Sequence, residues 1–198
     1  TTGICNVAIG SYAANGLTTG CINVAIGRGA LGTATTTGSS NIAMGFDAMN
    51  ALTSGACNVA IGENALGAAT TGCWNVAIGD LAMGAGVVTA SCNIAIGYAA
   101  MDAITSGQNN TAIGFEALGG ATIGIGNLAV GFKAMFAVTT AQADTNIAIG
   151  QCALHGNAST SGNDNIAIGR HSLLGPALTT GADNVAIGRN TGEDLTSG

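Results

Sequence analysis

Asn6-Val7-Ala8-Ile9-Gly10 is the stretch that decides the fold, because it returns ten more times in 198 residues with only conservative changes. Its asparagine recurs every 17 to 19 residues from one end of the chain to the other. A fixed period near 20 residues is typical of a solenoid, in which each repeat forms one coil that stacks on the next. We therefore expect residues 1–198 to form a single solenoid repeat array without a second domain.

Within the motif, side chains alternate, so that Val7 and Ile9 share one face of the chain while Ala8 lies on the other. Short β-branched alternation that ends at a glycine is typical of a strand. A helix is disfavoured, because a glycine in every five-residue block would cost about 1 kcal/mol relative to alanine each time. The sequence thus predicts an all-β fold, a parallel β-solenoid (β-roll) of about eleven coils of 17–19 residues.

Two corners are expected in each coil. The motif glycine, of which Gly10 is the first, never varies, which predicts a positive φ or a backbone contact too close for a Cβ. The two positions after it vary freely and hold most charged and aromatic residues, so they predict an exposed ridge. A leucine or methionine such as Leu31 then returns the chain to the core, and Thr-Thr-Gly or Thr-Ser-Gly makes the second corner.

The motif asparagines are expected to form a structural ladder. Identical amides stacked at strand spacing can hydrogen-bond from coil to coil, as they do in other stacked-strand structures. A metal or ligand role would need acidic neighbours, which only Asp164 and Asp183 provide. The expected ladder consists of Asn6, Asn23, Asn41, Asn58, Asn75, Asn93, Asn110, Asn127, Asn146, Asn165 and Asn184.

The alanine of the motif is never replaced, and a strand constrained on both faces is buried on both faces. One hypothesis is that these alanines point out of the coil and pack against the same row of another chain. The alternative is that they line the interior while Val and Ile pack outward. Both leave an apolar stripe that soluble monomers rarely carry, which predicts a symmetric homo-oligomer. The subunit-packing row would be Ala8, Ala25, Ala43, Ala60, Ala77, Ala95, Ala112, Ala129, Ala148, Ala167 and Ala186.

Five of the six cysteines stand one or two residues before a motif asparagine. Cys5 and Cys21, and likewise Cys57 and Cys73, lie 16 residues apart on adjacent coils, and stacking at about 4.8 Å brings such positions within disulfide reach. Two cross-coil disulfides would suit an extracellular setting. The alternative is that the four residues are small buried thiols, since free cysteine packs as an ordinary core residue.

Composition excludes several function classes. Only 7% of residues are charged, the net charge is −6 and the 4 basic residues are scattered, so neither nucleic acid nor an anionic membrane surface is an expected partner. No apolar run is long enough for a transmembrane helix. His155 and His171 belong to no recognisable triad or ligand set, and no lysine follows a phosphate-binding loop. We expect no enzyme activity, no cofactor and no metal site.

The unit Asn-Val-Ala-Ile-Gly-x-x-Ala resembles the repeat of trimeric autotransporter adhesin heads, and its longer form with Thr-Thr-Gly is similar to arrays in phage tail fibres and related surface proteins. The resemblance covers essentially the whole chain. It implies a left-handed parallel β-roll, assembled as a homotrimer in an extracellular setting, on a cell or virion surface. With rungs about 4.8 Å apart, the rod would be on the order of 50 Å long.

Thr1 stands inside the repeat pattern, and neither an initiator Met nor a signal peptide is seen. We therefore expect the chain to be an excised or processed part of a longer fibre protein. Its last residues match the Thr-Ser-Gly that precedes other repeats, so both ends are nearly in phase. Exposed strand edges are templates for pairing, which predicts end-to-end filaments as one form of self-assembly.

These features favour a structural protein of an extracellular fibre or filament that serves attachment or acts as a rigid spacer. Its main expected partner is itself, and a cell-surface receptor or glycan is a second one. An ice-binding solenoid is an alternative, because paired threonines such as Thr18 and Thr19 recur before the second corner. A glycan-binding solenoid is another, since aromatic rings on the ridge can stack on sugars; these are Tyr12, Phe46, Tyr98, Phe115 and Phe132.

Overall fold

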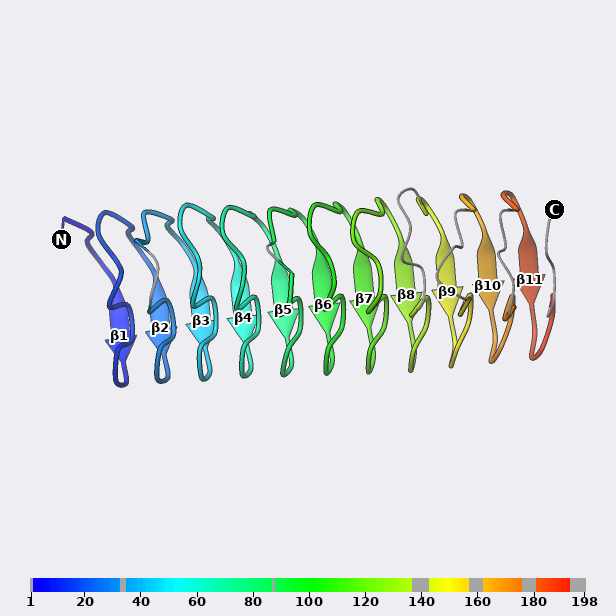
Figure 1. Cartoon of the computed structure of the whole chain (residues 1–198), viewed down its shortest axis with the longest axis horizontal. Coiled ribbons are helices and arrows are strands. Elements are labelled where there is room, and N and C mark those ends of the chain that lie inside the picture. Colours follow the sequence, from blue (N-terminus) through cyan, green and yellow to red (C-terminus); the bar gives the residue numbers. More distant parts are fainter. Residues whose placement is uncertain are drawn as a thin grey trace.

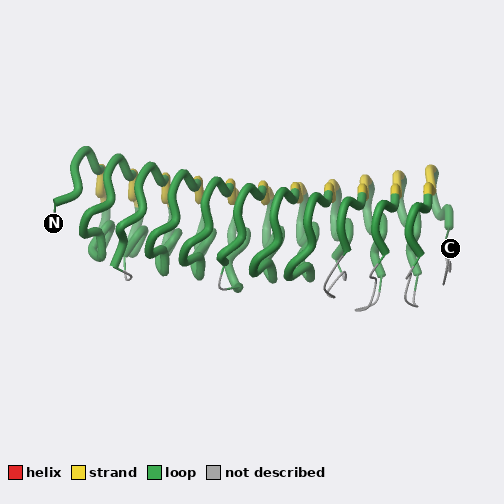
Figure 2. Tube along the Cα trace, turned by 90° about the horizontal axis from the view of Figure 1, so that it is seen from above, coloured by secondary structure: helices red, strands yellow, loops and turns green. Residues whose placement is uncertain are grey.

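The computed structural model describes residues 2–32, 35–86, 88–136, 143–156, 162–175 and 181–192. In this part of the chain, eleven three-residue strands stack in sequence order into one parallel sheet, one strand for each copy of the motif. Figure 1 shows them side by side along a rod, with β1 and β11 at opposite ends, and Figure 2 shows the strands in line along one side of it. The strands are β1 (Val7–Ile9), β2 (Val24–Ile26), β3 (Ile42–Met44), β4 (Val59–Ile61), β5 (Val76–Ile78), β6 (Ile94–Ile96), β7 (Thr111–Ile113), β8 (Leu128–Val130), β9 (Ile147–Ile149), β10 (Ile166–Ile168) and β11 (Val185–Ile187).

The fold is therefore an all-β parallel β-solenoid, as the repeat period predicts. Each strand pairs with the next in the same register, so that Ala25 lies opposite Ala43 and Ala148 opposite Ala167. This register is the same for repeats of 17, 18 and 19 residues, which means that the additional residues lie outside the strands. None of the described segments forms a helix that could cross a bilayer.

The interior of the coil holds the motif alanines together with the leucines and methionines that follow the first corner. From Ala25 to Ala167, every alanine of the row has an exposed fraction of 0%, and Ala186 has 7%. Only Ala8, in the end strand β1, is exposed. Leu31, Met49, Leu66, Met83, Met101 and their later equivalents fill the space opposite the sheet, as expected.

The hypothesis that the alanine row packs against another chain is therefore wrong. The alanines are covered by their own coil, and small side chains are required there because leucine and methionine already fill the narrow interior. Val and Ile point outward instead, which was the alternative reading of the same alternation. The corrected row comprises Ala8, Ala25, Ala43, Ala60, Ala77, Ala95, Ala112, Ala129, Ala148, Ala167 and Ala186.

The first corner has the two properties expected of its glycine. Gly62 has a φ of +138°, and a Cβ built on it would lie 2.4 Å from the carbonyl oxygen of Gly79 in the next coil. A side chain at this position would force the two coils apart. Both the backbone conformation and the coil spacing thus explain why glycine is invariant at the corner.

Residues other than glycine also adopt positive φ at three places in most coils, which the sequence does not reveal. In the fourth coil these are Asn64 (52°), Leu66 (49°) and Trp74 (61°). Each of these residues donates its N–H to a carbonyl oxygen of a neighbouring coil, at 2.9 to 3.1 Å. The left-handed conformation costs roughly 1–2 kcal/mol per residue, and these hydrogen bonds offset it.

Candidate interaction surface

The asparagine ladder lies at the start of every strand and is the most regular polar feature of the rod. Each side-chain Oδ1 accepts two hydrogen bonds from the next motif asparagine, one from its backbone N–H and one from its Nδ2. For Asn75 and Asn93 the two distances are 3.1 and 3.2 Å. All ten links between neighbouring coils have this geometry, so the predicted ladder is confirmed.

The ladder amides are also satisfied on their donor side. The second Nδ2 hydrogen of Asn75 goes to the carbonyl oxygen of Ala90, at 2.8 Å, in the second corner of the coil. Asn23 through Asn165 are buried at 0–3% exposure, and their hydrogen-bonding groups are used inside the protein. A ligand therefore has no free amide to bind along the interior of the ladder.

The outward side of the sheet is a flat apolar surface, which we call the strand face. It consists of the first and third side chains of each strand, and Thr111 is its only polar member. Ile61 and Ile113 are each 39% exposed, and Ile187 in the last strand is 64% exposed. The members are Val7, Ile9, Val24, Ile26, Ile42, Met44, Val59, Ile61, Val76, Ile78, Ile94, Ile96, Thr111, Ile113, Leu128, Val130, Ile147, Ile149, Ile166, Ile168, Val185 and Ile187.

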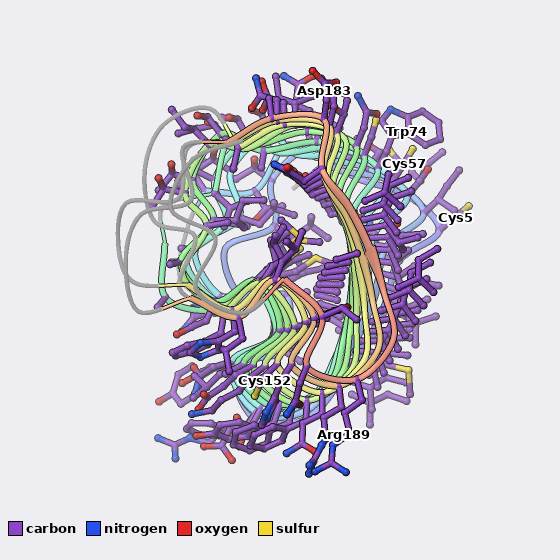
Figure 3. All side chains as sticks on the ribbon, turned by 90° about the vertical axis from the view of Figure 1, so that its right-hand side faces the viewer. Cys5, Cys57, Trp74, Cys152, Asp183 and Arg189 are labelled. Carbon is purple, nitrogen blue, oxygen red and sulfur yellow. The ribbon has the colours of Figure 1, made fainter. Side chains whose placement is uncertain are left out.

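Charged residues border the strand face: Arg28, Glu63 and Asp80 follow the corner glycines of earlier strands, and two pairs of like charge lie at one end of the rod. Asp164 and Asp183 stand one residue before the ladder asparagines of β10 and β11, and Arg170 and Arg189 stand directly after the corner glycines of the same strands. All four residues are exposed. In the end-on view of Figure 3, Asp183 and Arg189 lie at opposite edges of the sheet. We call the two pairs the acidic corner and the basic corner.

All six cysteines are free thiols, so neither Cys5 with Cys21 nor Cys57 with Cys73 forms a disulfide. The alternative of buried thiols does not hold either, because Cys5 is exposed and the other three are half-buried. Cys21 and Cys73 point along the rod, and each sulfur accepts a hydrogen bond from a backbone N–H of the preceding coil, at 3.5 and 3.4 Å. Figure 3 shows Cys5 and Cys57 on the outside of the coil.

Several threonines before the second corner use their hydroxyls within the protein. Thr53 donates its Oγ1–H to the carbonyl oxygen of Thr70 at 2.8 Å, and Thr105 donates to that of Thr122 at 2.9 Å. Thr36 donates to the carbonyl oxygen of Leu52 and is fully buried. These hydroxyls therefore bridge neighbouring coils. The paired threonines at 139–140 and 179–180 lie outside the described residues.

The aromatic ridge holds a stack of three rings. Tyr98, Phe115 and Phe132 lie in consecutive coils, with ring centroids 5.0 and 5.3 Å apart and interplanar angles of 14°. Their faces are turned toward one another along the rod, so mainly the ring edges reach solvent. A sugar stacks on an open ring face, and the inner faces of this stack are already covered. Tyr12 is exposed, and Phe46 lies under the guanidinium of Arg28 at 5.3 Å.

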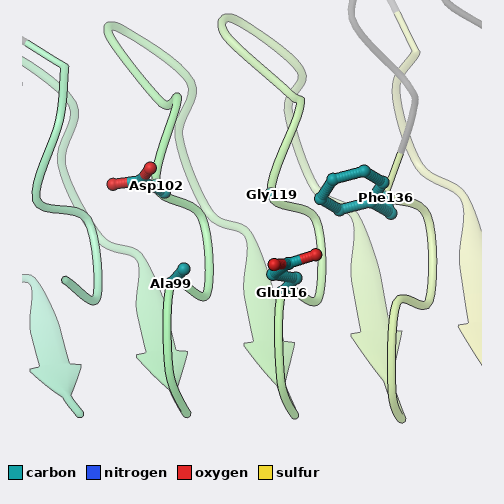
Figure 4. A pocket seen from close by; sticks show the side chains of 5 residues that line it. All are labelled: Ala99, Asp102, Glu116, Gly119 and Phe136. Atoms are coloured by element: carbon teal, nitrogen blue, oxygen red, sulfur yellow. The ribbon is translucent and has the colours of Figure 1, made fainter. Parts of the chain in front are cut away.

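Beside this stack lies a cavity of about 210 Å³, lined by Ala99, Asp102, Glu116, Gly119 and Phe136 (Figure 4). Its size is below the range of about 300–1,000 Å³ that is usual for small-molecule sites. The Glu116 carboxylate forms an ion pair with Lys133 at 3.1 Å, which accounts for an oxygen that makes no other polar contact. The ammonium of Lys133 also lies 4.8 Å from the ring centre of Phe136.

Burial is the main cause of the pKa shifts of two ionisable groups near this cavity. Burial raises the pKa of Asp102, and the neighbouring Glu116 charge adds to the rise, although hydrogen bonds from the backbone of Ala85 and Gly84 oppose it. Burial lowers the pKa of His155, whose ring stacks on Phe136 at 5.8 Å. The part of the chain that the structure describes holds no group of three or more His, Cys, Asp or Glu side chains placed to bind a metal.

Comparison with known proteins finds no match to this chain among protein-family models, curated proteins or solved structures. The fold and its surface therefore define the class: a parallel β-solenoid repeat protein with one flat apolar face. Within that class, the face and the charged corners that border it are the features of this particular chain that suggest a function.

Proposed function

We propose that the chain is a structural segment of an extracellular fibre, a rigid rod that assembles with copies of itself through the strand face. The single observation that carries the proposal is the composition of that face, which has no charged residue on eleven strands. Two side chains per strand point outward, and in the middle of the rod they are half-buried or about two-fifths exposed, so the face presents apolar area on the order of 1,000 Å².

An apolar area of this size favours a permanent partner. The largest apolar patch of a typical monomer covers about 300–600 Å², and a stable interface buries about 800 Å² on each partner. A trimer, as the resemblance to adhesin heads implies, would place three strand faces around a common axis and cover all of them. The rod would then act as a spacer or attachment element, because its length is set by the number of coils.

The two alternatives have less support. An ice-binding surface needs a flat outward array of hydroxyls. Thr53 and Thr105 instead donate their hydroxyl hydrogens to backbone carbonyl oxygens of the next coil. Glycan binding through the ridge needs open ring faces, but Phe115 is stacked on both sides. A receptor that contacts the edges of these rings stays a proposal.

The test is the native mass of the protein by sedimentation equilibrium, with and without Ile61→Lys combined with Ile78→Lys on the strand face. We expect the unmodified rod to sediment as a defined oligomer, and the double variant to dissociate at the same concentration because two charges would be buried in the contact. Ser54→Lys with Thr71→Lys is the matched control, since both residues are exposed away from the sheet at the second corner. A monomeric mass for the unmodified protein would overturn the proposal.

A further inference from the structure

The charges that border the strand face are not distributed evenly along the rod. At the edge before the strands, the position directly before each ladder asparagine is charged only in the last two coils, where Asp164 and Asp183 form the acidic corner. At the edge after the strands, the basic corner occupies the same last two coils, whereas Glu63 and Asp80 make this edge acidic in the fourth and fifth coils and Arg28 is its basic residue in the second coil. Negative and positive pairs thus stand at equal heights on opposite edges of one surface.

Neither corner can neutralise the other within one chain. Asp164 and Arg170 are six residues apart across an extended strand, a separation of roughly 20 Å. Among the described residues, the only ion pair is that between Lys133 and Glu116. Asp164 does accept a hydrogen bond from the hydroxyl of Thr145, but this leaves its charge in place. Within each corner, moreover, like charges stand on adjacent rungs about 4.8 Å apart, which is unfavourable unless a counter-charge lies nearby.

Symmetry brings the two corners together when copies associate side by side. If the strand faces meet around an axis parallel to the rod, the edge before the strands of one copy meets the edge after the strands of the next copy, at the same height. We propose that copies of this chain associate parallel and in register, with Asp164 and Asp183 of one copy facing Arg170 and Arg189 of the next. This inference rests on the proposed self-association, and it adds the orientation and register of the partner.

The opposite orientation is disfavoured by the same residues. If the faces met around an axis perpendicular to the rod, each edge of one copy would meet the same edge of the other copy, with the coils in reverse order. Arg170 in the tenth coil would then face Arg28 in the second, and Asp164 would face the exposed side chain of Ile22. A like-charge contact and uncompensated carboxylates replace two ion pairs, whereas Glu63 and Asp80 face uncharged residues in both arrangements. Electrostatics therefore favours the parallel one.

The first experiment reverses one corner at a time. We expect Asp164→Lys with Asp183→Lys to weaken self-association at least about tenfold at low salt, because both corners that meet are then positive. Adding Arg170→Glu and Arg189→Glu to the same chain exchanges the corners, and self-association is expected to return to within about threefold of the unmodified protein. An unaffected oligomer in the first variant, or no recovery in the four-site variant, would overturn the charge pairing.

The second experiment reports orientation directly. In a background in which the native cysteines are serine, Asp183→Cys with Arg189→Cys should form disulfide-linked oligomers only if the two corners meet between copies. A second chain, which keeps Cys92 as its single cysteine, serves as the opposite probe, because reversed rods would bring Cys92 close to the same residue of the other copy at the centre of the contact. Cross-linking through Cys92 alone would contradict the parallel arrangement. If the oligomer dissociates when lysines are placed on the strand face but is unchanged by every corner variant, this inference is wrong and the proposed function still holds.

Discussion

At the scale of single residues, asparagine is the side chain that the ladder requires. Its Oδ1 accepts two hydrogen bonds while its Nδ2 donates two, and Asn75 does all of this at distances of 2.8 to 3.2 Å. Aspartate lacks the donors, and glutamine would place the amide one methylene further from the backbone. The ladder could be predicted because the same residue recurs at the same place in the motif and identical amides pair when stacked.

Replacing one rung of the ladder tests this account. Asn75→Ala removes the acceptor of the buried Asn93 N–H and the donor to Ala90, so we expect a loss of roughly 2–4 kcal/mol in the free energy of unfolding. Gln108→Ala, at an exposed position two residues before Asn110, is the control and should change stability by less than about 0.5 kcal/mol. Urea unfolding followed by circular dichroism measures both variants. Equal stability of the two would contradict a structural role for the ladder.

The direction of the alanine row could not be predicted for a physical reason. Alternation assigns Ala60 and Ile61 to opposite faces, but it does not tell which face points into the coil. The larger side chain would ordinarily be the buried one. Here Leu66 and Leu52 fill most of the interior. The space that remains between them and the sheet holds only a methyl group. The conformation of the corners, which sends these leucines inward, decided the outcome.

At the scale of the element, no strand is stable alone, because each contains three residues. Stability comes from coil-to-coil contacts, which also maintain left-handed conformations at residues that rarely adopt them. Leu66 and Trp74 have φ values of 49° and 61°, and neither residue type marks such a conformation in a sequence. Invariant Gly62 does mark its corner, whereas nothing in the sequence marks the left-handed conformations of Leu66 and Trp74.

The corner glycine offers a direct test of how closely the coils stack. Gly62→Ala would place a Cβ 2.4 Å from the Gly79 carbonyl oxygen at a φ of +138°, so we expect a loss of at least about 3 kcal/mol in the free energy of unfolding. Gly126→Ala is the comparison, since its φ is +72° and the nearest atom, in the side chain of Thr145, lies 3.4 Å away. That variant should lose only about 1 kcal/mol. Thermal and chemical unfolding would rank the two, and the reverse order would refute the argument from coil spacing.

At the scale of the whole molecule, each strand contacts only its two neighbours in the sheet. Stability is then expected to be close to a sum over coils and the contacts between adjacent coils. Removal of one whole repeat should therefore be tolerated, provided that the ladder and the register are preserved. The period of the motif predicts this modular organisation, and the constant register of the eleven strands bears it out.

Deleting residues 58–74, which are one complete 17-residue repeat, would join Cys57 to Asn75 and restore the motif. We expect the shortened chain to keep its β-sheet circular dichroism, with an unfolding temperature only a few degrees lower. Deleting residues 58–66, about half a repeat, is the control and should abolish cooperative unfolding because it places a corner against a strand. Similar behaviour of the two deletions would show that the coils do not act as units.

The ladder also gives the rod an electrical direction. Every Oδ1 from Asn6 to Asn165 accepts from the coil that follows it and none accepts from the coil before, so the amide dipoles add instead of cancelling. Aligned hydrogen bonds polarise one another, as they do in an α-helix. The electrostatic field of the rod therefore differs between its two directions, and a neighbouring rod experiences this difference even across the apolar strand face. A bundle of parallel rods would be polarised along its length.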